Sequence, residues 1–107
     1  MWYIFPQIRG LGRTTTSQYY AIQSLDEAKA FLADPFLCEK LVSICEVLLR
    51  LESSDATEIF GKTDDKKLRS SMTLFACASD GCDVFDAVLE KFFSGKPDYR
   101  TLNILGI

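Results

Sequence analysis

Apolar residues recur every three or four positions through most of the chain, and this spacing constrains the fold more than any other feature. The pattern begins near residue 25 and continues to residue 105, with breaks at clusters of glycine, proline and aspartate. A repeat of this kind places an apolar stripe on each of a series of helices. Nothing in it requires a sheet. The sequence therefore predicts an all-α, single-domain bundle of about five to seven short helices at mixed crossing angles.

Helix-capping residues mark where these helices begin. Ser24 with Glu27 three residues later forms a capping box, and Asp34 followed by proline announces a second helix that runs to about Leu51. The apolar stripe of this second helix is wide, so we expect it to be central. A short turn at 56–60 closes at a glycine. Further helices are expected from residue 63 or 64 to 78, at 83–93 and at 98–105.

Composition and charge exclude several classes of function. The chain has 107 residues and a net charge of −3, which argues against nucleic-acid binding because that requires a basic surface. No apolar run reaches the ~20 residues of a membrane span, and the first residues do not form a signal peptide. We therefore expect a cytoplasmic protein with reduced thiols. The cysteine spacing does not suit zinc, and packing or simple exposure is favoured for Cys38, Cys45, Cys77 and Cys82.

The chain contains no histidine, and this absence removes the commonest catalytic machinery. Nucleophilic catalysis by Ser-His-Asp or Cys-His groups needs an imidazole, as does most proton transfer near neutral pH. Any enzyme would have to rely on lysine, cysteine or carboxylates. We expect no catalytic residues, no cofactor and no metal, and a non-enzymatic role is favoured.

Several stretches carry a family resemblance: "MWYIFPQIRGLGRT", "SQYYAI" with "SLDEAKAFLA", "EIFGKTDDKKLRSSMTLFA" and "VLEKFFSGKPDYRTLNILG". They resemble a bacterial family called domain of unknown function 1810, over essentially the whole chain. The resemblance implies an all-helical single domain with no established activity. Because family members carry another helix before the first stretch, we expect this chain to be N-terminally truncated. Some members are labelled calpastatin-like, but calpastatin acts through disordered segments, whereas these apolar stripes suit a compact chain.

The opening stretch contains the first candidate binding group. Residues 5–20, "FPQIRGLGRTTTSQYY", combine two glycines with two arginines and several hydroxyls. The glycines complete neither a phosphate-binding loop nor a dinucleotide fingerprint, but arginines and backbone amides coordinate phosphate or carboxylate groups. The alternative is a solvated connector whose hydroxyls cap the next turn. The candidate ligand-binding residues of this stretch are Gln7, Arg9, Arg13, Thr14 and Ser17.

A second polar group interrupts the apolar pattern of the helix expected at 63–78. Hydroxyl side chains are unusual in a helix interior because they compete for backbone hydrogen bonds. Together with the opening stretch, such a polar notch can hold an anion. A Ser-Lys nucleophile is disfavoured because the usual serine-first order is reversed. The alternative is that the hydroxyls bond to their own helix. The candidate residues are Lys67, Arg69, Ser70, Ser71 and Thr73.

Two functional interpretations remain, and they belong to different classes. The first is a cytosolic module that binds a small phosphate- or carboxylate-bearing ligand between the opening stretch and the serine-bearing helix. The second is a protein-interaction or self-associating module without a small-molecule site. Its contact surface would be the aromatic side chains of Trp2, Tyr3 and Phe5, because exposed aromatic patches mark interfaces.

Overall fold

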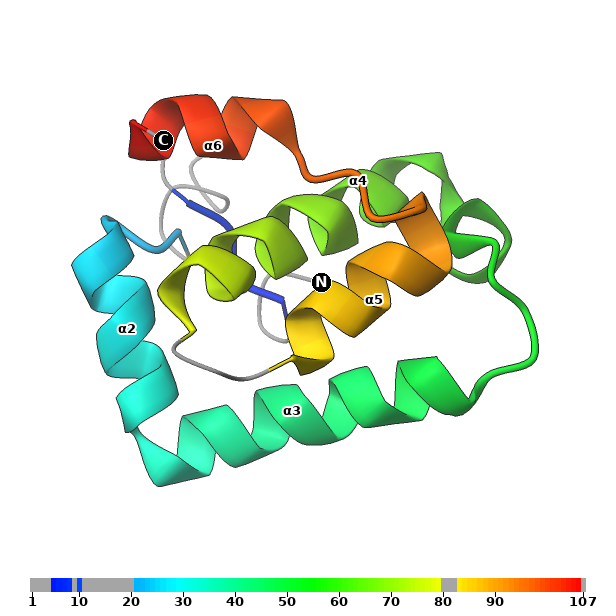
Figure 1. Ribbon diagram of the computed structural model, residues 1–107, viewed down its shortest axis with the longest axis horizontal. Coiled ribbons are helices and arrows are strands. Elements are labelled where there is room, and N and C mark those ends of the chain that lie inside the picture. The colour runs from blue at the N-terminus through cyan, green and yellow to red at the C-terminus, as the bar shows by residue number, and fades with distance from the viewer. Residues whose placement is uncertain (1–4, 9, 11–20, 80–82, 107) are drawn as a thin grey trace.

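Five helices follow one another in the described part of the chain, which comprises residues 5–8, 10, 21–79 and 83–106 of a computed structural model. They are α2 (Leu25–Ala33), α3 (Pro35–Arg50), α4 (Ala56–Ala78), α5 (Val84–Phe93) and α6 (Tyr99–Leu105) (Figure 1). Within these residues no strand is assigned, and one parallel β-bridge joins Ile8 to Ile22. The prediction of an all-α fold is confirmed.

Side chains cap most of these helices at the predicted positions. Ser24 Oγ accepts a hydrogen bond from the amide of Glu27 at 3.1 Å, and Asp34 accepts from two amides in the first turn of α3. Asp55 and Asp98 cap α4 and α6 in the same way. Each bond satisfies an N–H group that the helix itself leaves unpaired. These capping bonds therefore determine where four of the helices begin. The residues that form them can be recognised from the local sequence.

A kink at Gly61 divides α4. Its backbone has φ 87° and ψ 169°, a combination that is essentially restricted to glycine. The predicted break at this glycine is confirmed, and helical residues continue on both sides of it. The longer, second part of α4 carries the predicted polar group.

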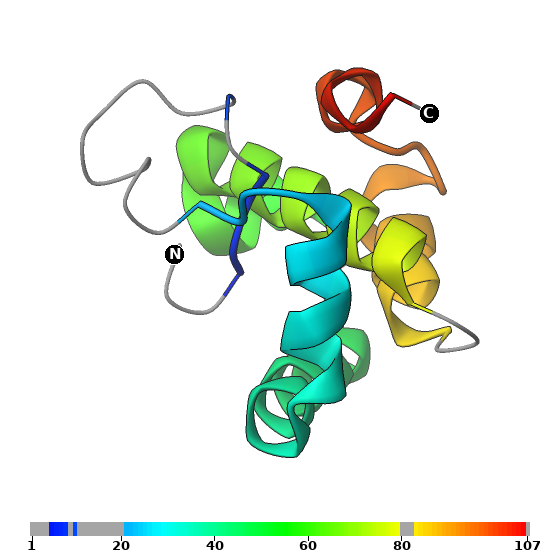
Figure 2. The same ribbon diagram turned by 90° about the vertical axis from the view of Figure 1, so that its left-hand side faces the viewer.

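The central element of the fold is α4. Residues 70–75 are all buried, and a helix that is buried at consecutive positions is enclosed on every side. α2, α5 and α6 pack against α4, whereas α3 packs against α5 and α2 (Figures 1 and 2). Phe36 and Val47 of α3 remain 65% and 46% exposed. The prediction that α3 is central is wrong, because α3 packs against its neighbours on one face only and exposes these two apolar residues on the other.

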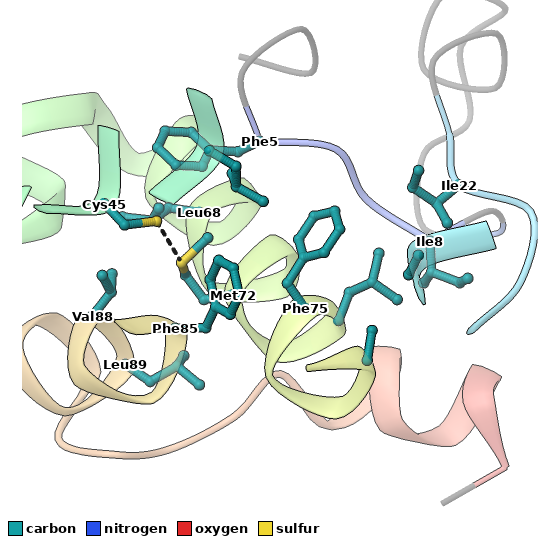
Figure 3. Packing of buried hydrophobic residues seen from close by; sticks show 14 of the residues in the cluster. Phe5, Ile8, Ile22, Cys45, Leu68, Met72, Phe75, Phe85, Val88 and Leu89 are labelled. Carbon is teal, nitrogen blue, oxygen red and sulfur yellow. Dashed lines mark hydrogen bonds between the residues drawn. The ribbon is translucent and has the colours of Figure 1, made fainter. Parts of the chain in front are cut away.

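Aromatic rings and sulfur atoms join the helices in the core (Figure 3). The ring centroid of Phe75 on α4 lies 5.2 Å from that of Phe31 on α2 and 5.8 Å from that of Phe85 on α5. Cys45 Sγ of α3 lies 3.6 Å from Met72 Sδ of α4. Full burial of one phenylalanine or methionine side chain stabilises a fold by roughly 1.5–3 kcal/mol. These contacts hold α4 in place, and its polar residues are thereby fixed in direction.

The described part of the opening segment, residues 5–8, lies across α4 (Figure 2). The amide of Ile22 donates a hydrogen bond to the carbonyl oxygen of Gln7 at 2.7 Å, beside the bridge between Ile8 and Ile22. Both isoleucines are buried. Burial and pairing therefore anchor this segment on the bundle.

Phe5 belongs to the core. It is 3% exposed, and its ring meets that of Phe60 edge-on at a centroid distance of 6.5 Å. The expectation that Phe5 contributes to an exposed aromatic surface is wrong, because Phe60 at the start of α4 covers it. Trp2 and Tyr3 lie outside the described residues.

Candidate functional site

The polar residues in the middle of α4 leave the helix in different directions. Successive residues of an α-helix are separated by about 100° around its axis, since each turn takes 3.6 residues. Arg69, Ser70 and Ser71 therefore project from three faces, whereas Arg69 and Thr73 share one face. The predicted polar group is divided among the opening segment, the core and the connection between α5 and α6.

Ser70 faces the opening segment. Gln7 Nε2 donates a hydrogen bond to Ser70 Oγ at 2.5 Å, across 63 positions of the sequence. The hydroxyl of Ser70 has two acceptors within its own helix, the carbonyl oxygens of Lys66 and Lys67, both at 3.1 Å. A buried hydroxyl is thus satisfied as donor and as acceptor. The expected contact between the opening stretch and the serine-bearing helix exists at this pair.

Arg69 and Thr73 face the connection that leads into α6. Arg69 donates from Nε to the carbonyl of Lys96 at 3.2 Å and from Nη2 to that of Pro97 at 2.8 Å. Thr73 Oγ1 donates to the carbonyl of Arg69 and accepts from the amide of Asp98, both at 2.8 Å. Both side chains therefore hold this connection on α4. The sequence offers no signal for these contacts, because the partners are backbone groups, which do not depend on residue type and lie 25 to 28 positions away: an amide donor for Thr73 and carbonyl acceptors for Arg69.

Ser71 and Lys67 have other surroundings. Ser71 is fully buried, and its Oγ has no hydrogen-bond partner within the described residues. Lys67 Nζ forms an ion pair with Asp64 Oδ1 at 3.2 Å. The lysine is only partly exposed, so this pair is better shielded from water than a fully exposed one.

The structure thus joins two predicted residues from distant parts of the sequence, Gln7 and Ser70. It assigns Arg69 and Thr73 to the α6 side and Ser71 to the core. The other candidates of the opening stretch lie outside the described residues, and their positions stay predictions: Arg9, Arg13, Thr14 and Ser17.

Cys77 has a perturbed thiol. Cys38, Cys45 and Cys77 are free, and Cys82 lies outside the described residues. Burial raises the pKa of the Cys77 thiol, and the nearby carboxylate of Asp86 raises it further. Because the thiolate is the reactive form, Cys77 is a weak nucleophile at neutral pH. The described residues contain no group of three or more His, Cys, Asp or Glu arranged to hold a metal ion.

Comparisons with known proteins agree with this helical arrangement. The family model described as "Protein of unknown function (DUF1810)" matches residues 1–105. The chain is similar to the crystal structure of the conserved hypothetical protein Rv1873 from Mycobacterium tuberculosis, with a TM-score of 0.95 and 42% sequence identity. This similarity covers 99% of the chain and 76% of that protein's chain. No curated protein matches the chain. In the described residues, no helix combines the length and apolar character needed to cross a membrane.

Proposed function

The chain belongs to the DUF1810 family of proteins of unknown function, and from that premise we propose that it is a binding module for a small anionic ligand, held where the opening segment crosses α4. The observation that carries the proposal is the hydrogen bond from Gln7 Nε2 to Ser70 Oγ. It anchors on α4 the segment that continues through Arg9 and Arg13. This segment contains no acidic residue, although the chain as a whole is acidic.

The chemistry of the proposed site suits a compact phosphate or carboxylate group. Guanidinium groups of the opening stretch bind such anions through paired hydrogen bonds, and Thr14 and Ser17 supply hydroxyl donors. On α4, Lys67 precedes Ser70 by three residues, and a bound anion would compete with Asp64 for its ammonium group. Arg69, Ser71 and Thr73 are left out of the proposed ligand shell, because the α6 connection and the core already occupy them.

Thermal unfolding with inorganic phosphate, sulfate or nucleotides tests the proposal. A ligand present at about 100 times its Kd adds about 2.7 kcal/mol to the free energy of unfolding. Lys67→Met should reduce this stabilisation because it removes a charge near the anchored segment. Lys62→Met is the matched control, since Lys62 is an exposed lysine of the same helix. The proposal fails if none of these anions raises Tm, or if the two variants lose the effect equally.

A second candidate function is self-association through the outer face of α3. Phe36 is 65% exposed, and it borders a shallow groove of about 380 Å³ that also contains Ile44 and Val47. Glu39 and Lys40 line the same groove, so an antiparallel second copy can match opposite charges across it. Analytical ultracentrifugation at high protein concentration tests this role. A dimer that Phe36→Ser abolishes would support it, and a monomer at all concentrations would contradict it.

A further inference from the structure

We propose that two copies of the chain pair through the outer face of α3, antiparallel and related by a two-fold axis. The inference rests on the self-association role given above as the second candidate, and it specifies the partner and the register. α3 lies along one edge of the molecule, with α2 and α5 packed on its inner side (Figures 1 and 2). Among the described helices, none covers its outer side.

Four apolar residues form a helical stripe on this face, which we call the outer stripe: Phe36, Ile44, Val47 and Leu51. Phe36, Val47 and Leu51 are 65%, 46% and 38% exposed. Ile44 lines the groove of about 380 Å³ that Phe36 and Val47 border, and the surface of this groove is mainly apolar. At about 100° per residue, the four positions lie within about 80° around the helix. Contact with a matching apolar surface removes the outer stripe from water, which favours association.

The outer stripe has the symmetry that self-contact requires. In a two-fold contact, residue i of one copy meets residue j of the other, and residue j meets residue i. The midpoint of the stripe lies between Ser43 and Ile44, because Phe36 is seven residues before Ser43 and Leu51 is seven residues after Ile44. Antiparallel pairing about this midpoint places Phe36 of each copy beside Leu51 of the other. The exposed Ser43 has a small side chain, so the two helices can approach closely at the centre.

Lys40 lies between Phe36 and Ile44 along the outer stripe. Its Nζ is 4.6 Å from the centroid of the Phe36 ring, so its hydrocarbon chain adds to the apolar surface. Lys40 precedes Ser43 by three residues and Val47 follows Ile44 by three, so the same pairing places Lys40 beside Val47 of the second copy. Its ammonium group must stay hydrated at the edge of the contact, which weakens association. We therefore expect a weak dimer that forms at high protein concentration.

Opposite charges border the outer stripe at its two ends. Glu39 lies near the start of α3 and Arg50 is its last residue, and both are exposed. They lie on the same side of the stripe, because the eleven residues between their positions complete about three turns. In the described part of the chain, neither has an ion-pair partner. Antiparallel pairing brings Glu39 of each copy next to Arg50 of the other, whereas parallel pairing would place the two arginines together. Charge complementarity therefore favours the antiparallel second copy.

Sedimentation equilibrium of the full chain and of charge variants tests this register. Glu39→Arg and Arg50→Glu should each raise the Kd of the dimer about tenfold, because both ion pairs become repulsive. An equimolar mixture of the two variants should recover the original affinity, since both ion pairs are attractive in the mixed dimer. Lys62→Glu is the control for Arg50→Glu, because it makes the same charge change at an exposed lysine of α4. It should leave the Kd unchanged.

The outcomes separate this register from self-association itself. A monomer at all concentrations would overturn both. A dimer that Phe36→Ser abolishes, but that neither charge reversal weakens, would overturn the antiparallel register alone. So would a mixture of the two variants that fails to recover the affinity. Equal weakening by Arg50→Glu and Lys62→Glu would also contradict the register, because net charge would then govern the association.

Discussion

Ser71 and Thr73 are buried hydroxyl residues two positions apart on α4, and they differ in their hydrogen bonding. Thr73 has a donor and an acceptor, whereas Ser71 Oγ has no partner among the described residues. An unsatisfied buried polar group costs about 1–3 kcal/mol. We expect Ser71→Ala to raise the free energy of unfolding by about 1 kcal/mol, measured by urea denaturation.

Thr73→Val is the matched control for that substitution, because it removes a hydroxyl from the same buried stretch. It leaves the amide of Asp98 without its acceptor. We expect a loss of about 1–3 kcal/mol in the same measurement. If both variants destabilised the protein to the same extent, Ser71 would have a hydrogen-bond partner that the described residues do not reveal.

The raised pKa of Cys77 leads to a prediction about how the rate of its alkylation depends on pH. Burial and the charge of Asp86 raise its pKa, so its thiolate forms at higher pH than that of an ordinary cysteine. At a fixed pH near 8, we expect Asp86→Asn to speed alkylation of Cys77, because removing the negative charge lowers the pKa. Peptide mass spectrometry over a pH series measures this, with Cys38 as the internal reference. An unchanged Cys77 profile would show that burial alone sets its pKa.

For single residues, sequence reasoning predicted some contacts and could not predict others. The sequence left open whether the hydroxyls of α4 bind a ligand or bond to their own helix. Ser70 and Thr73 do bond to it, as donors to carbonyls one turn earlier. The contacts of Arg69 with Lys96 and Pro97 depend on backbone oxygens brought close by packing, and no local pattern encodes those.

At the scale of helices, the starts were predictable and the packing order was not. Each cap is a hydrogen bond between residues two or three positions apart, so it can be predicted from the local sequence. The capping residues are Ser24, Asp34, Asp55 and Asp98. The mistaken central position of α3 has a different cause. A wide apolar stripe shows how much surface a helix can bury, but it does not show how many other helices pack against that surface.

The C-terminal end of α3 depends on one side chain from α5. Lys91 Nζ donates hydrogen bonds to the carbonyls of Leu48 at 2.9 Å and Leu49 at 3.0 Å, and also to that of Leu51. These carbonyls lie at the negative end of the helix dipole, where a cation is favoured. We expect Lys91→Met to destabilise the protein by about 1–2 kcal/mol in urea denaturation.

Lys62→Met is the control for Lys91→Met, because it removes the same charge from an exposed position on α4. It should change stability by less than about 0.5 kcal/mol. Amide hydrogen exchange in the last turn of α3 should also become faster in the Lys91→Met variant, but not in the control variant. Equal effects of the two variants would mean that net charge, and not the capping of α3, determines the result.

At the scale of the whole molecule, α6 is attached differently from the other helices. α2, α4 and α5 share the aromatic core around Phe75, whereas α6 packs against α4 and is preceded by the connection that Arg69 binds. Local unfolding begins in elements with few buried apolar contacts. We therefore expect α6 to open without unfolding the rest. Arg69→Met should lower the free energy of that opening by about 2 kcal/mol, since two hydrogen bonds from a charged group are lost.

Native-state hydrogen exchange measures this difference in cooperativity. In Arg69→Met, amides of α6 should exchange faster while those around Val88 in the core keep their protection. Arg100→Met is the control, because Arg100 is an exposed arginine of α6 itself. If α6 and the core lost protection together, the bundle would unfold as one unit, and the hydrogen bonds of Arg69 would stabilise the whole fold. If only α6 responded, these bonds would set the stability of one helix, independently of the core that holds α4.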